Sequence, residues 1–151
     1  NGGTVRDKKG NYYTKVEELP EGYFRIDQIG HGVRKNRLTK ADVDRYAELG
    51  GLKSLNVSNA TLEEGAVAYL AEKFPRLQEL YLAYSNVTDA DLEHLQGMEL
   101  LRDLQIKNTS ISDVGLHHLE KATALTYVAA TDTQVTAAGV AELKKTLPRC
   151  N

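Results

Sequence analysis

Two histidines are the residues of this chain best placed to bind a metal ion. His94 and His118 are 24 residues apart, and a chain that repeats at this interval would bring their imidazoles close together. A structural zinc site takes four ligands, however, and the equivalent positions in the neighbouring copies hold Tyr69 and Glu142. We therefore interpret both histidines as half-buried packing residues, and we predict no metal site and no cofactor.

A column of hydroxyl side chains, Ser85, Thr109 and Thr133, recurs at the same interval of 24 residues. A serine or threonine nucleophile needs a neighbouring base, and the sequence around these residues offers none. Each hydroxyl instead follows an alternating apolar segment, where a side chain must satisfy backbone groups that a strand leaves unpaired. The column is predicted to be structural, and no catalytic residue is assigned.

A third group combines aromatic, charged and amide side chains at positions between the leucines or just beyond them. Its members are Glu79, Tyr81, Tyr84, Asp103, Gln105, Lys107 and Tyr127. Tyrosine contributes contact area and one hydroxyl at little cost in conformational entropy, so it is useful in a binding surface. Exposed tyrosine also suits β-strands in general, and the sequence is equally compatible with that alternative. We predict that this group forms a partner-binding surface.

The elements that position these residues follow from one phrase, Leu-x-x-Leu-x-Leu and its apolar variants, which begins at Leu77, Leu101 and Leu125. An earlier copy begins at Leu52, and a degenerate copy covers residues 28–38 with His31 in place of a core leucine. Alternation of apolar and polar residues within each copy predicts a short strand with one buried face. The apolar residues that follow at helical spacing predict a helix. A Ser or Thr before most of these helices is suited to cap them.

A 24-residue period with this phrase is typical of a leucine-rich-repeat solenoid. The predicted α/β fold has a curved parallel sheet on its concave side and short helices on its convex side. Segments 87–95 and 111–119 resemble the "VTDAGLAHL" phrase of bacterial leucine-rich-repeat proteins abundant in planctomycetes, and segment 139–150 is similar to that family's closing segment. The resemblance implies an interaction domain, often exported or membrane-anchored, with no shared catalytic residue.

The first 27 residues do not follow the period. Segments 4–6 and 12–16 flank a turn-forming stretch at 7–11, which predicts a β-hairpin. The predicted domain therefore consists of a hairpin cap over residues 1–27 and an array over residues 28–151, with one degenerate and four clear repeats. Segment 2–7 is similar to the segment that opens such domains after a helix, so we expect the chain to derive from a longer product.

The composition restricts the partners of this domain. Nineteen basic and 21 acidic side chains give a net charge of −2, which does not favour nucleic acid. The strongest basic run is Arg34, Lys35, Arg37, Lys40 and Arg45. We interpret this run as a solvated face, with binding of an anionic ligand as the alternative. The single cysteine, Cys150, excludes an intramolecular disulfide. No stretch approaches the roughly 20 apolar residues of a membrane span, so we expect no membrane insertion. We also expect a monomer.

These observations indicate a non-catalytic recognition or scaffold module that binds a protein or peptide through the concave face. The alternative is a regulatory or substrate-recruiting segment of a larger enzyme or of an envelope-anchored receptor. An autonomous hydrolase would need a nucleophile, a base and an orienting group, which the sequence does not bring together. The family resemblance implies an exported or cell-envelope location.

Overall fold

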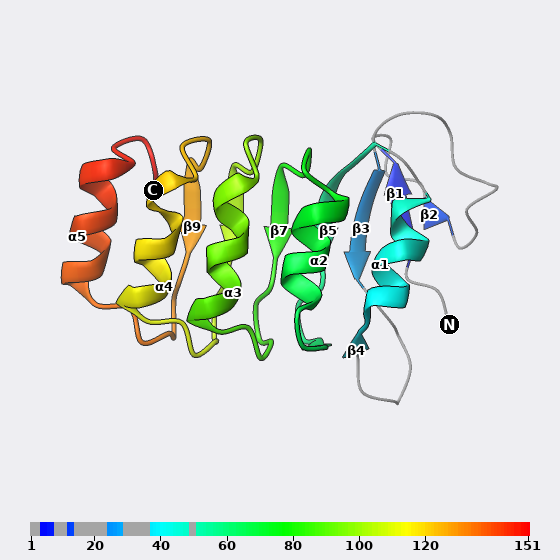
Figure 1. Cartoon of the computed structure of the whole chain (residues 1–151), viewed down its shortest axis with the longest axis horizontal. Coiled ribbons are helices and arrows are strands. Elements are labelled where there is room, and N and C mark those ends of the chain that lie inside the picture. The colour runs from blue at the N-terminus through cyan, green and yellow to red at the C-terminus, as the bar shows by residue number, and fades with distance from the viewer. Residues whose placement is uncertain (1–3, 8–11, 14–23, 29–36, 49–50) are drawn as a thin grey trace.

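Five parallel strands make up most of the seven-stranded main sheet of the structure, a computed structural model that describes residues 4–7, 12–13, 24–28, 37–48 and 51–151. These strands are β3 (Phe24–Gln28), β5 (Leu52–Asn56), β7 (Glu79–Tyr81), β8 (Asp103–Gln105) and β9 (Tyr127–Ala129). They follow one another in chain order along the long axis of the molecule (Figure 1). The parallel sheet that the repeated phrase predicts is therefore confirmed.

Helices form a second row beside the sheet, as Figure 1 shows. They are α1 (Lys40–Ala47), α2 (Ala66–Lys73), α3 (Asp89–Glu93), α4 (Asp113–His118) and α5 (Ala137–Thr146). The 3₁₀ segments η2 (His94–Gly97) and η3 (Leu119–Lys121) continue α3 and α4. A small parallel sheet pairs β4 (Arg37–Leu38) with β6 (Thr61–Leu62).

The core lies between the sheet and the helices and runs through all the clear repeats. Leu80, Leu82, Leu104 and Ile106 are fully buried and belong to one continuous apolar cluster. Leucines from the helices, such as Leu92, complete the same cluster. Each repeat is too small to bury its own apolar face, so neighbouring repeats stabilise one another through this shared core.

A hairpin extends the sheet beyond β3, as predicted. β1 (Thr4–Asp7) pairs antiparallel with β2 (Tyr12–Tyr13), and β1 also pairs antiparallel with β3. The hairpin thereby occupies the edge of β3 that the repeats leave open. The division into a cap over residues 1–27 and an array over residues 28–151 stays a prediction, and β3 spans that boundary.

The register predicted for the degenerate repeat is wrong. Ile26 pairs with Leu55 in the sheet, whereas counting back by one period gave that place to His31. Residues 29–36, which include His31, lie outside the described part of the chain. Leu38 does pair with Leu62, as the period requires. Compared with the next repeat, this repeat therefore has extra residues between β3 and β4. A count of periods in the sequence cannot locate such an insertion.

Candidate functional site

The sheet brings most of the predicted binding residues into two adjacent rows. In the first row, Glu79 pairs with Asp103 and Asp103 pairs with Tyr127, because β7, β8 and β9 are aligned without a shift. In the second row, Tyr81 pairs with Gln105. Neighbouring strands lie about 4.8 Å apart, so each row is continuous. We call the side chains of these rows, together with Tyr84 and Lys107, the concave patch.

The side chains of the concave patch differ in how much of them solvent can reach. Tyr84 and Tyr127 are 59% and 41% exposed, whereas the other members are half-buried. The hydroxyl of Tyr81 donates a hydrogen bond to Glu79 Oε2 at 3.0 Å, which fixes these two side chains against each other. Ser54, which continues the first row on β5, is fully buried. In the first row, the accessible side chains therefore lie on β7, β8 and β9.

Each clear repeat turns beyond its strand at a residue with left-handed backbone conformation. The φ angles are 62° at Asn59, 58° at Tyr84, 54° at Asn108 and 57° at Asp132. The backbone N–H of Tyr84 donates to the Lys107 carbonyl at 2.9 Å, and Asn59 and Asn108 make the equivalent bond to the next repeat. The repeat architecture therefore imposes this conformation whichever residue occupies the position.

The hydroxyl column has the structural role predicted for it. Ser85, Thr109 and Thr133 each donate to the carbonyl three residues earlier, at 2.6 Å in every case. These bonds satisfy carbonyl groups where the chain leaves the strand, so the hydroxyls are committed to the turn.

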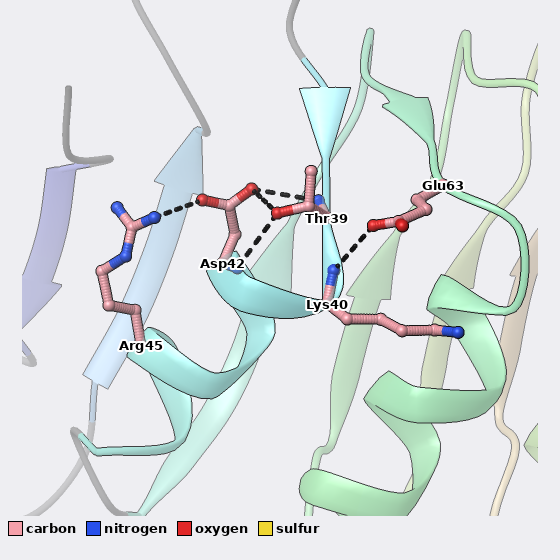
Figure 2. Close-up of polar contacts among 5 residues, drawn as sticks. All are labelled: Thr39, Lys40, Asp42, Arg45 and Glu63. Carbon is pink, nitrogen blue, oxygen red and sulfur yellow. Dashed lines mark hydrogen bonds and ion pairs between the residues drawn. The ribbon is translucent and has the colours of Figure 1, made fainter.

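Two capping boxes confirm the expected start of α1 and α3. Around α1, the Thr39 N–H donates to Asp42 Oδ2 at 3.0 Å, and the Asp42 N–H donates to Thr39 Oγ1 at 3.3 Å (Figure 2). Figure 2 also shows the ion pair of Arg45 with Asp42 and the bond from the Lys40 N–H to Glu63. Arg45, part of the predicted basic run, thus has a carboxylate partner, whereas Arg34 and Lys35 lie outside the described residues.

Sequence reasoning missed a carboxylate ladder that links successive repeats on the helix side. Asp89 accepts hydrogen bonds from the Ser112 N–H at 2.8 Å and the Ser112 hydroxyl at 2.6 Å. Asp113 accepts the same pair from Thr136, at 2.8 and 2.7 Å. These bonds favour the charged form, so the Thr136 backbone and hydroxyl lower the pKa of Asp113. The recurring Thr/Ser-Asp dipeptide was the signal in the sequence that pointed to this ladder.

The ladder also explains two glycines. A Cβ at Gly115 would overlap Asp89 Oδ1, and a Cβ at Gly139 would overlap Asp113 Oδ1. The two earlier ladder positions hold Lys40 and Glu64, and the residues that replace glycine in the repeats after them are Ala66 and Asp91. The aspartate of one repeat and the glycine of the next, 26 residues later, therefore form one structural unit.

His118 is half-buried, as expected, but His94 is exposed, so the half-buried packing role expected for His94 is wrong. The ring centroids of His117 and His118 lie 6.5 Å apart. Within the described ranges, no group of three or more His, Cys, Asp or Glu side chains is placed to hold a metal ion. In the same part of the chain, every helix is too short or too polar to cross a membrane.

Comparison with known proteins places the fold. Actin-binding site 2 of leiomodin-1 superimposes with a TM-score of 0.57 at 15% identity, covering 74% of this chain and 73% of that one. Internalin C2 of Listeria monocytogenes gives 0.53 at 17% identity, covering 85% and 68% of the two chains. A leucine-rich-repeat protein of Leptospira interrogans gives 0.52 at 16% identity, covering 83% of this chain and 36% of its own.

At the level of sequence, no family model and no curated protein matches the chain. The likeness to the solved structures is therefore one of fold. Together with the in-register parallel sheet and its row of short helices, it shows that this chain is an α/β leucine-rich-repeat solenoid.

Proposed function

We propose that the chain is a non-catalytic module that binds a protein or peptide through the concave patch. The observation that carries the proposal is the exposure of Tyr84 and Tyr127, 59% and 41%, together with the alignment of Tyr127 with Asp103 and Glu79 in one row of the sheet. Packing does not require aromatic groups at exposed positions, whereas interfaces favour them. The candidate nucleophiles Ser85, Thr109 and Thr133 all donate to backbone carbonyls, which supports a non-catalytic role.

The similar structures support this use of the fold. The leiomodin-1 segment is named as an actin-binding site, so a solenoid of this kind serves as a protein-binding surface in that protein. We propose protein binding for the present chain on the same architectural ground, with a partner of its own. We also propose that the repeats are of the planctomycete type, on the strength of the segments 87–95 and 111–119, and that the chain is exported or held at the cell envelope.

A second candidate is a regulatory or substrate-recruiting segment of a larger enzyme or envelope-anchored receptor. The chain covers 36% of the Leptospira interrogans protein, which shows that this fold unit also occurs as part of longer chains. In that setting the concave patch would recruit the substrate or a regulatory protein, so the same surface is tested in both cases.

The test compares substitutions on the two faces of the solenoid. The chain is immobilised, proteins retained from an extract of its source cells are identified by mass spectrometry, and each candidate partner is produced and titrated by calorimetry. Tyr127→Ala and Tyr81→Ala should each weaken binding by at least about 2 kcal/mol if these tyrosines are anchors. His117→Ala is the convex-side control, because this side chain is 73% exposed. Loss of binding with the control alone would refute the assignment.

A further inference from the structure

The outer edge of β9 is covered by the chain only in part. β9 ends the strand order of the main sheet and is the last strand in the row of Figure 1. Asn151 reaches the start of this edge, where its N–H donates to the Thr126 carbonyl at 3.0 Å and its carbonyl accepts from the Val128 N–H at 2.9 Å. Further along the edge, no carbonyl group of the described residues accepts from the N–H of Ala130 or of Asp132.

In the other clear repeats, the donors equivalent to these two are bonded to the next repeat. The N–H groups equivalent to Ala130 donate at 2.7–2.9 Å and belong to Val57, Leu82 and Ile106. Those equivalent to Asp132 donate at 2.8–2.9 Å and belong to Asn59, Tyr84 and Asn108. For Leu82 and Tyr84, the acceptors are the carbonyls of Gln105 and Lys107, two residues apart on one parallel chain. The two unused donors of the last repeat therefore have the spacing that a further parallel strand would satisfy.

An apolar hollow adjoins the same edge. Val128 and Ala130 line it beside side chains of α4, α5 and the last residues, among them Leu116, Val140, Leu143 and Cys150. Val140 is 39% exposed, whereas the equivalent Leu92 and Leu116 of the two preceding repeats are 0% and 2% exposed. The next repeat covers those leucines, so the last repeat presents apolar surface of the kind that an internal repeat buries.

We propose that this edge is a second binding surface, separate from the concave patch, and that it takes an extended segment of a partner protein as an added parallel strand. Backbone carbonyls of the segment accept from the N–H groups of Ala130 and Asp132, and an apolar side chain between those carbonyls enters the hollow. The main-chain bonds supply affinity, and the hollow selects an apolar residue. Two copies of this chain meeting edge to edge would share only the short stretch beyond Asn151, so a separate segment uses the edge more fully.

The probe is a synthetic peptide with blocked ends and the sequence of residues 104–109. In the folded chain this segment already supplies the carbonyls of Gln105 and Lys107 to the preceding repeat, and its Ile106 is fully buried. The peptide is titrated into the isotope-labelled chain and followed by NMR. We expect saturable shifts of the Ala130 and Asp132 amide signals and slower hydrogen exchange at both, because their N–H groups become bonded.

Substitutions on both molecules test the geometry. Val140→Asp places a charge in the hollow and should weaken peptide binding at least about 10-fold. Its matched control is Val114→Asp, which should leave the affinity unchanged, because Val114 is 59% exposed on α4 and does not line the hollow. Ala130→Pro removes one donor at an edge position and should weaken binding as much as Val140→Asp. A peptide carrying Ile106→Asp should bind the parent chain as poorly.

Several results would overturn the proposal. The peptide might shift no signals, shift only those of the concave patch, or bind the Val140→Asp and Val114→Asp variants equally. Sedimentation of the parent chain without peptide tests the other occupant, since self-association that Val140→Asp abolishes would assign the edge to a second copy. Tyr81→Ala, which tests the proposed function, should leave the peptide affinity unchanged, so each proposal can fail without the other.

Discussion

The coupling between an aspartate and the glycine of the next repeat gives a sharp test of the structure. In α5, the three heavy atoms nearest to a Cβ at Gly139 all belong to Asp113. Gly139→Ala should therefore force the Asp113 carboxylate away from Thr136, although alanine is by itself the better helix former. In a chain without Asp113, Gly139→Ala should raise the free energy of unfolding instead of lowering it.

The expected change in the free energy of unfolding follows from two opposing effects of Gly139→Ala. Alanine in place of glycine stabilises a helix by about 1 kcal/mol. Inserting a methyl group into occupied space costs about 1–3 kcal/mol. In the parent chain, Gly139→Ala should thus destabilise by about 0–2 kcal/mol, because the methyl group displaces the carboxylate. In an Asp113→Ala background, the same substitution should stabilise by up to about 1 kcal/mol.

The assay is urea unfolding followed by circular dichroism for the parent, both single variants and the double variant. Gly97→Ala is the control, because a Cβ at Gly97 meets nothing within 4 Å; it should stay within about 0.5 kcal/mol of the parent. Rescue of Gly115→Ala by Asp89→Ala should be incomplete, since Ile111 Cγ2 lies 2.9 Å from the added Cβ. If Gly139→Ala has the same effect in both backgrounds to within about 0.5 kcal/mol, the coupling is refuted.

Leu104→Ala should destabilise the chain by about 2–5 kcal/mol because Leu104 is fully buried in the shared core, and a urea midpoint close to that of the parent would contradict the register of β8 in the sheet. Deleting residues 1–22 should expose the edge of β3 that β1 covers and promote aggregation, which size-exclusion chromatography measures; a variant that stays monomeric and equally heat-resistant would show that the hairpin is dispensable. The hydrogen bonds from Thr136 lower the pKa of Asp113 from 3.8 in the folded chain. The stability that the ionised Asp113 carboxylate contributes is therefore present above pH 3.8 and is lost as pH falls through the folded-state pKa. The stability difference between the parent and Asp113→Asn should accordingly shrink below pH 3.8, and a difference independent of pH would refute this role.

The sequence alone was sufficient to predict the strands of the clear repeats and their alignment in the sheet. The alternation around Leu80 and Leu104 defines a strand face, and the constant period aligns Glu79, Asp103 and Tyr127 across three strands. These features depend on short-range periodicity and on identical spacing between copies, so they can be read without coordinates. The structural role of the hydroxyl column was predictable for the same reason, because it recurs at one position of the repeat.

The remaining features depend on contacts between residues that the period does not relate. Ile26 rather than His31 lies opposite Leu55, since an insertion between strand and turn shifts the register without changing the pattern on either side. The pairing of Asp113 with Gly139 joins two repeats and becomes visible only when a Cβ is placed in the folded chain. The left-handed φ of Tyr84 comes from hydrogen bonds to the neighbouring repeat. Tertiary structure decided these points because each is imposed by a neighbouring repeat, whereas local sequence sets only the preferences that the neighbour overrides.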